Sequence, residues 1–273
     1  MTIAPDKLAE ILRDAAKREI LPRFRKLDEG MVRTKSSAID LVTEADVGAE
    51  RVITAALKQA APDALVVGEE AVAADASLLD RALDAPFVIY VDPVDGTANF
   101  VGGLPLYAVM ASVVVNGETV AGVIYDPMGD DWLMAEIGSG AWLKFPDGRA
   151  IPQRFSDPAP LNDMIGTASP FYMQPAARAK VLANFNKLRM VASYRCAGHE
   201  YRLAAGGNIH FLMFHKLMPW DHLAGSLIMQ EAGAFVARFD GEPYLPAHRD
   251  GGLLIAPDQD SWTELRQQVF VDA

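Results

Sequence analysis

Hydrophobic positions recur along the first third of the chain with the periods of helices and strands. Over residues 5–24 the apolar side chains at helical spacing form one face, namely Leu8, Ile11, Leu12, Ala15, Ala16 and Ile20. A second helix is predicted for residues 43–60, and the run "ALVVGEE" after it predicts a short strand. A helix around residues 74–83 then precedes "PFVIYVD", a pattern typical of a buried strand.

Hairpins dominate the next part of the chain. The stretch "LYAVMASVVVNGETVAGVIYDP" predicts two long strands joined at Asn116 and Gly117, a pair suited to a tight hairpin turn. Further hairpin strands follow, separated by "GSG" and by Asp147-Gly148. The first half is therefore predicted to pack helices on a mostly antiparallel sheet.

Strands and helices alternate from about Asn162 onward, which indicates an α/β layer. Helices are predicted near residues 175–188, 200–205 and 221–233, and a last one where Ser261 and Glu264 have the spacing of a capping box. The strands are predicted in "MIGTAS", "RMVASY", "NIHFLMF", "AFVARF" and "GGLLIAP".

The proline-rich stretch 147–160 is the expected seam between the two halves. We expect residues 1–150 to form an N-terminal α+β subdomain that binds metal and phosphate. Residues 151–273 would form a C-terminal α/β subdomain that contributes substrate contacts and the last metal aspartate. A cleft would lie between them.

Composition limits the classes of protein that fit. The 273 residues are 51% hydrophobic, enough for a large buried core. No signal peptide and no apolar stretch of membrane-spanning length is recognisable, so we expect a cytoplasmic protein with no membrane partner. The single cysteine, Cys196, excludes an intrachain disulfide and is expected to be a small core residue.

Charge adds a constraint on the substrate. The formal net charge is −11 and the basic residues are scattered, which argues against a nucleic-acid partner. An acidic cleft would also repel an anionic substrate unless a cation lies between them.

The sequence "DPVDGT" puts two carboxylates, Asp92 and Asp95, directly after an apolar run. Because Pro93 cannot donate a ladder hydrogen bond, we expect regular pairing to stop there. Both aspartates would then lie in a loop at the carboxyl end of the strand, where α/β proteins bind ligands. A type I turn is the alternative role. The amides of Gly96 and Thr97 are predicted to open a short helix that can cradle an anion.

The other candidate carboxylates each have a structural alternative. Glu69 and Glu70 follow an apolar strand, but glutamates at a helix start are also common on surfaces. Asp46 has capping-box spacing from Thr43, although a first helical turn can also project it into a cleft. Asp221 in "WDHLAGSLIMQEAGA" has the N-cap of a helix as its simpler role.

Taken together, carboxylates from several elements beside an anion cradle are typical of a magnesium site. Mg²⁺ prefers oxygen ligands and is usually held by a few carboxylates and a substrate phosphate. Two such ions about 3.5–4 Å apart can activate a water and stabilise the leaving oxygen. Such cations would also turn an acidic cleft into a phosphate receptor.

The motifs "GEE", "DPVDGTANF" and "WDHLAGSLIMQEAGA", in this order and at these separations, resemble those of the inositol monophosphatase family of Mg²⁺-dependent, lithium-sensitive phosphatases. With "KSSAIDLVTEAD" upstream, the resemblance covers nearly the whole chain. It implies an α/β (α+β) fold, a layered αβαβα sandwich, and usually a homodimer.

The resemblance also implies a set of metal ligands. Glu69, Asp92 and the backbone carbonyl of Val94 would hold the first ion. Asp92, Asp95 and Asp221 would hold the second. A third, weaker ion would involve Glu69.

The resemblance implies catalytic and phosphate-binding roles as well. Thr97 and Asp46 match the pair that, with Glu69, orients and deprotonates the attacking water. The amides of Gly96 and Thr97 would bind the phosphate, and Lys35 matches a loop lysine near the metals. In-line attack of a metal-activated water needs no phospho-enzyme, and the Asp-x-Asp spacing that an aspartyl-phosphate mechanism requires is not present at Asp92 and Asp95.

Substrate choice is less determined. Inositol-specific members carry a carboxylate seven residues before the last metal aspartate, whereas this chain has Phe214 there. His199 and Glu200 are candidate contacts to substrate hydroxyls or amines, but we favour a solvated surface role for them. His210, His222 and His248 lack metal-ligand spacing and are expected to be structural or on the surface.

We therefore expect a phosphomonoesterase that acts on a small polyol or sugar phosphate, resembling inositol-1-monophosphatase. Histidinol phosphate, fructose 1,6-bisphosphate and 3′-phosphoadenosine 5′-phosphate are the substrates of relatives and remain alternatives. A non-catalytic phosphate-sensing module is disfavoured because Glu69, Asp46 and Thr97 are all present.

Overall fold

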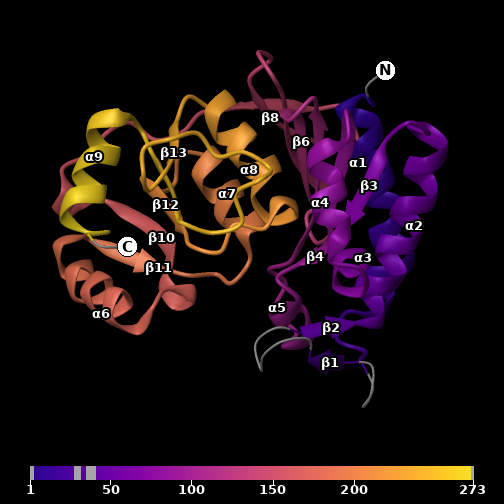
Figure 1. Ribbon diagram of the computed structural model, residues 1–273, viewed down its shortest axis with the longest axis horizontal. Helices are drawn as coiled ribbons and strands as arrows, with labels where there is room; N and C mark the ends of the chain where they lie inside the picture. Colours follow the sequence, from indigo (N-terminus) through magenta and orange to yellow (C-terminus); the bar gives the residue numbers. More distant parts are fainter. Residues whose placement is uncertain (1–2, 28–31, 35–40, 272–273) are drawn as a thin grey trace.

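Five layers, in the order helices, sheet, helices, sheet, helices, make up the part of the chain that the structure describes. The structure is a computed structural model that describes residues 3–27, 32–34 and 41–271. Figure 1 shows the layers from α1 and α2 on one side to α6 and α9 on the other. Separate clusters of buried side chains fill the spaces between the layers. The predicted αβαβα sandwich is confirmed.

The first sheet is mostly antiparallel, as predicted. Its strands β3 and β4 run parallel and each later neighbour runs antiparallel to the one before. The hairpin turn between β5 and β6 lies at Asn116 and Gly117. In spatial order the strands are β3 (Leu65–Gly68), β4 (Phe87–Asp95), β5 (Ala108–Val115), β6 (Glu118–Asp126), β7 (Asp131–Glu136), β8 (Ala141–Lys144) and β9 (Ala150–Gln153).

One outer layer consists of α1 (Pro5–Ala15) and α2 (Glu44–Ala60), which cover one face of the first sheet. A π-helical turn, Ala16–Ile20, and a 3-10 turn, Leu21–Arg23, continue α1, so the predicted helical segment is confirmed. Successive residues of β4 are buried alternately against this layer and against the opposite face. A strand covered on both faces needs a continuous apolar run, which "PFVIYVD" supplies.

The second sheet is mixed. Its first three strands in space, β11, β10 and β12, run parallel, and the remaining pairs are antiparallel. In spatial order the strands are β11 (Met190–Ala192), β10 (Ile165–Ser169), β12 (Phe211–Phe214), β14 (Leu253–Ala256) and β13 (Phe235–Arg238).

Helices α7 (Ala197–Ala205) and α8 (Pro219–Glu231) form the middle layer between the two sheets. α6 (Pro175–Asn184) and α9 (Gln259–Gln268) cover the outer face of the second sheet. α8 lies directly against β6, and a Cβ added at Gly122 would come within 2.7 Å of the Cα of Ala224. This contact brings the start of α8 close to the first sheet.

Some predicted boundaries are wrong. The helix expected around residues 74–83 is α4 (Ser77–Asp84), but an additional short helix, α3 (Glu69–Ala74), precedes it, so Glu69 and Glu70 begin a helix rather than end a strand. The last helix is capped by Asp258, whose carboxylate accepts a hydrogen bond from the Ser261 amide at 2.7 Å. Ser261 and Glu264 therefore do not form the predicted capping box. Within the described ranges, every helix is too short or too polar to cross a bilayer.

Candidate active site

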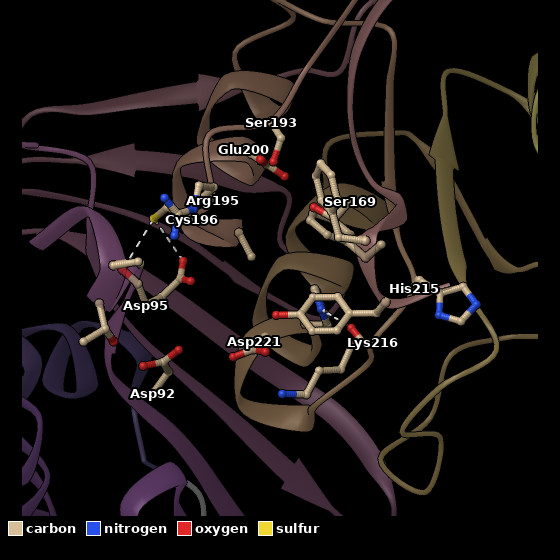
Figure 2. A pocket seen from close by; sticks show the side chains of 18 of the residues that line it. Asp92, Asp95, Ser169, Ser193, Arg195, Cys196, Glu200, His215, Lys216 and Asp221 are labelled. Atoms are coloured by element: carbon tan, nitrogen blue, oxygen red, sulfur yellow. Dashed lines mark hydrogen bonds between the residues drawn. The ribbon is translucent and has the colours of Figure 1, made fainter. Parts of the chain in front are cut away.

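A cavity of about 410 Å³ opens between the two sheets and brings together most of the predicted site residues. Figure 2 shows Asp92 and Asp95 on one side and Asp221, from α8, facing them. The predicted residues that line the cavity are Glu69, Asp92, Val94, Asp95, Gly96, Thr97, Glu200, Phe214 and Asp221. Lys35, predicted from the resemblance, lies outside the described residues.

β4 reaches the cavity through an irregularity rather than by ending. Pairing with β5 continues from Asp92 opposite Met110 to Asp95 opposite Ala108, with a register shift between them. The expectation that pairing stops at Pro93 is therefore wrong. In a regular strand, residues three apart point to opposite faces, and the extra residue of a bulge cancels that alternation. This is how both carboxylates reach one cavity.

Asp95 is held by the segment that leads into α7. Its Oδ2 accepts hydrogen bonds from the Gly198 amide at 2.6 Å and from the Cys196 thiol at 3.1 Å. Burial raises the pKa of Asp95, while these hydrogen bonds act to lower it. Cys196 is 2% exposed, so the prediction of a small core residue is confirmed, and its new role is to support a carboxylate.

Asp92 and Asp221 face each other across the cavity, and their carboxyl groups interact electrostatically. Asp221 is the third residue of α8, which begins at Pro219, so it does not cap that helix. Burial and the nearby carboxylate of Glu69 raise the pKa of Asp92 well above its ordinary value and that of Asp221 to about 8. Two acids held this close repel each other when both are charged, and the nearby Lys216 offsets only part of that repulsion.

The position of Glu69 depends on Glu50, a residue that the sequence analysis missed. The buried carboxylate of Glu50, on α2, accepts hydrogen bonds from the amides of Glu70 at 2.7 Å and Ala71 at 2.8 Å. It thereby satisfies amides at the start of α3 and fixes the turn that carries Glu69. Glu50 lies four residues after Asp46 on the same helix, and this spacing, which puts both carboxylates on one helix face, is the sequence signal that could have identified it.

Thr97 and Asp46 are in direct contact. The Thr97 hydroxyl lies 3.1 Å from Oδ1 of Asp46 and 2.9 Å from the carbonyl oxygen of Val94. The other oxygen of Asp46 accepts hydrogen bonds from the Thr43 amide and hydroxyl, so the capping box exists as well. Burial raises the pKa of Asp46 to about 7. The structural and functional roles of Asp46 are thus compatible.

The short helix predicted to begin after Gly96, which would serve as the anion cradle, is present as α5 (Thr97–Val101). Its N-cap is Gly96, with φ of 86°, and a Cβ there would lie 2.9 Å from the Leu106 carbonyl oxygen. Only glycine fits this backbone. Asn99 on α5 donates hydrogen bonds to the carbonyls of Leu106 and Tyr194, so the cradle is anchored to both halves of the chain.

Glu200 is not on the surface, so that expectation is wrong. It is 1% exposed, and its two carboxylate oxygens accept hydrogen bonds from the Tyr194 amide at 2.7 Å and the Thr167 hydroxyl at 3.2 Å. Burial raises its pKa to about 7. α7 begins at Ala197, so Glu200 lies in its first turn. The ring of His199 contacts the carbonyl oxygen of Tyr107 at 3.2 Å rather than lining the cavity.

The predicted structural role of the remaining histidines is confirmed at His222. Its Nδ1 lies 3.1 Å from the Tyr201 hydroxyl and its Nε2 lies 2.9 Å from the Lys216 carbonyl oxygen. A carbonyl only accepts, so Nε2 donates and Nδ1 accepts from Tyr201. Burial lowers the pKa of His222 to about 3, which keeps the ring neutral beside the acidic cavity.

The donor set of the cavity fits a hard divalent cation. Glu69, Asp92, Asp95 and Asp221 are oxygen donors from three different elements, and burial raises the pKa of the three aspartates. Across the described ranges, no three acidic, histidine or cysteine side chains already have the spacing of a formed metal site. The raised pKa values of these aspartates are expected of acidic groups gathered around a cation site.

Comparison with known proteins places the chain in a family. The family model described as inositol monophosphatase family matches residues 4–272. The chain is 31% identical over 212 residues to a fructose-1,6-bisphosphatase/inositol-1-monophosphatase of Thermotoga maritima, covering 77% of this chain and 76% of that protein. It is 30% identical over 221 residues to the Nus factor SuhB of Vibrio cholerae, covering 78% and 77%.

Solved structures agree with the fold. The extragenic suppressor protein suhB of Bartonella henselae superposes with a TM-score of 0.82 at 27% identity, covering 98% of each chain. An IMPase of Thermotoga maritima superposes with a TM-score of 0.80 at 26% identity, covering 97% of this chain and 96% of that one. The family is generally Mg²⁺-dependent. This chain belongs to the inositol monophosphatase family and is a phosphomonoesterase.

Proposed function

We propose that the cavity between the sheets is the active site of a Mg²⁺-dependent phosphatase that hydrolyses a small polyol or sugar phosphate. The observation that carries the proposal is the convergence of Glu69, Asp92, Asp95 and Asp221 on one cavity, next to the amides that open α5. Carboxylates would otherwise repel a phosphate, so this pairing makes sense only with cations.

The positions of the oxygen donors indicate which residues would hold each metal ion. Glu69, Asp92 and the Val94 carbonyl would hold one ion, and Asp92, Asp95 and Asp221 a second, with a third and weaker ion at Glu69. Magnesium, when bound, supplies the positive charge that makes a water acidic and offsets charge on the phosphate.

The chain's own groups act on the water and the phosphate. The Thr97 hydroxyl has two acceptors in reach, Asp46 and the Val94 carbonyl, and one proton to donate, so it can give its proton to Asp46 while its oxygen accepts one from a water. We infer that Thr97 orients the attacking water and passes its proton toward Asp46, with Glu69 on the other side. The amides of Gly96 and Thr97 bind the phosphate oxygens.

The test is phosphate release by the purified protein with and without Mg²⁺, on inositol 1-phosphate, fructose 1,6-bisphosphate and glycerol 2-phosphate. Asp95→Asn is the matched variant, because asparagine keeps an oxygen for the Gly198 amide but removes the charge. We expect Mg²⁺-dependent release that Asp95→Asn abolishes. If the Asp95→Asn variant releases phosphate at the same rate as the natural protein, the cavity is not the active site.

A phosphate-binding module without catalysis is the second candidate, and the relatives described as Nus factor SuhB are the reason to keep it. In that case Asp95→Asn would weaken phosphate binding, and neither protein would release phosphate. We also expect a homodimer in the cytoplasm and inhibition by lithium, as the family resemblance implies. Light scattering and a lithium titration of phosphate release test the first and last of these.

A further inference from the structure

Three parallel strands of the second sheet end at the cavity, opposite the carboxylates of β4. β11, β10 and β12 are neighbours and run in the same direction, with Ser169 of β10 opposite Phe214 of β12. Carboxyl ends of parallel strands meet at one edge of a sheet, where ligands bind. The residues that follow these strands and line the cavity are Phe171 and Tyr172, Arg195, and His215 and Lys216.

This wall is aromatic and exposed. Phe171 and Tyr172 are 58% and 54% exposed, the highest values among the large hydrophobic side chains that the structure describes. Phe214 lies behind this surface at 4% exposure, with its ring centroid 5.1 Å from that of Tyr201 and 4.5 Å from that of His222, so it supports the wall from within. Isolated exposed apolar side chains are ordinary, but adjacent aromatic rings that line a cavity form a surface for a ligand to cover.

Phe214 and Glu200 offer little to a ring of hydroxyl groups. Phe214 has no hydrogen-bonding group, and both oxygens of Glu200 already accept hydrogen bonds from Tyr194 and Thr167. A bound polyol loses its hydrogen bonds to water and needs protein partners in their place. Besides Thr97, the neutral hydroxyls that line the cavity are those of Tyr172, Ser169 and Ser193, and Figure 2 shows the two serines on the side away from Asp92.

Two cations reinforce the preference for a flat ring. The Lys216 ammonium lies 5.5 Å from the centroid of the Tyr172 ring, and Figure 2 shows this lysine beside Asp221. Arg195 lines the cavity from the segment after β11. Guanidinium and aromatic groups both stack on the faces of planar unsaturated rings.

We propose that the alcohol part of the substrate carries a planar unsaturated ring, which stacks on Phe171 and Tyr172 while the phosphate lies at Gly96 and Thr97. This inference rests on the proposed phosphatase function, and it puts an alcohol with a planar ring in place of the polyol or sugar. A bare polyol phosphate such as inositol 1-phosphate is then a poor substrate.

The test compares benzyl phosphate with cyclohexylmethyl phosphate. Both are esters of primary alcohols with a six-membered carbon ring, and they differ in whether that ring is planar. We expect kcat/KM with Mg²⁺ to be about tenfold higher for benzyl phosphate, the order of one aromatic stacking contact. Benzyl alcohol should likewise inhibit hydrolysis of glycerol 2-phosphate at a lower concentration than cyclohexylmethanol.

Substitutions of the two exposed aromatic residues test whether these rings cause the preference for benzyl phosphate. Phe171→Ala and Tyr172→Ala should each lower kcat/KM for benzyl phosphate by about tenfold and leave that for glycerol 2-phosphate nearly unchanged. Because both side chains are exposed, we expect both variants to fold like the natural protein. Leu182→Ala on α6 is the matched control, because Leu182 is 45% exposed and does not line the cavity.

The outcomes separate this inference from the function on which it rests. Mg²⁺-dependent release that Asp95→Asn abolishes, with equal kcat/KM for the two ring esters or a clear preference for inositol 1-phosphate, would overturn the stacking proposal and leave the phosphatase intact. If the protein releases phosphate from none of these esters, both proposals fall.

Discussion

The carboxylate oxygen Oδ2 of Asp95 lies 2.6 Å from the amide nitrogen of Gly198, which is 103 residues further along the chain. One residue belongs to β4 of the first sheet and the other to α7 in the layer between the sheets. This single hydrogen bond fixes a candidate metal ligand to the segment that carries Arg195 and Cys196, so the two sides of the cavity are positioned together.

Gly198→Ala should damage this link. A Cβ at Gly198 would lie 2.7 Å from the Ala108 Cβ and 3.1 Å from Oδ2 of Asp95, so the carboxylate has to move. We expect kcat/KM to fall by about 100-fold, as displacements near 1 Å do in active sites. Gly206→Ala is the control, because the nearest atom there is the side-chain nitrogen of Asn208, an exposed residue that can turn away. Equal activity of the two variants would contradict the assignment.

Asp92→Asn should separate stability from function. Asparagine keeps the oxygen that accepts the Val94 amide, and it removes a buried charge that Glu69, Asp95 and Asp221 repel. In the absence of Mg²⁺ at pH 8, we expect the variant to be more stable by about 1–2 kcal/mol in thermal or urea unfolding. Added Mg²⁺ should raise the Tm of the natural protein and not that of the variant, which should also be inactive. If the variant is less stable than the natural protein in the absence of metal, the carboxylates do not destabilise the fold by repelling one another.

Glu200→Gln should change how stability depends on pH. The pKa of Glu200 is about 7 in the folded protein and near its ordinary value, 4.5, in the unfolded chain. The folded state therefore binds more protons between these values, and stability falls as the pH rises from 4.5 through 7. Glutamine cannot titrate, yet its oxygen can accept from Tyr194 and its amide can donate to Thr167. We expect the variant to match the natural protein at pH 5 and to be more stable at pH 8, by urea unfolding at both pH values. If the free energy of unfolding changed with pH in the same way in both proteins, this prediction would be wrong.

Thr97→Val should test the water-orienting hydroxyl. Valine has nearly the shape of threonine and retains the backbone amide, but it cannot hold a water between Asp46 and the cavity. We expect kcat to fall by about 100-fold with little change in KM, the usual range for loss of a proton-transfer partner. Thr97→Ser should restore most of the rate. Loss of activity in both variants would point to a packing role for the methyl group instead.

The layers and the main acidic residues could be predicted from the sequence because both depend on local pattern. β4 is continuously apolar because it is covered on both faces, and its carboxylates follow directly in the same run. The anion cradle likewise follows from consecutive residues, Gly96 and Thr97. These are short-range features that a single sequence displays.

Features that depend on distant partners could not be predicted. The bulge at Pro93 exists because β5 resumes pairing with Asp95, and nothing near Pro93 in the sequence names Ala108 as the partner. Glu200 looked like a surface residue because its hydrogen-bond partners, Thr167 and Tyr194, come from other elements. Glu50 escaped notice for the same reason, since the amides it binds are 20 and 21 residues away.

The contact between Gly122 and Ala224 has a further consequence. At this point α8 approaches the backbone of β6 with no side chain on the strand between them. Asp221 is one turn before Ala224 on α8, so the separation between Asp221 and Asp92 depends on this close approach. The spacing of two proposed metal ligands is therefore linked to a glycine in the middle of a strand, which is not itself a ligand.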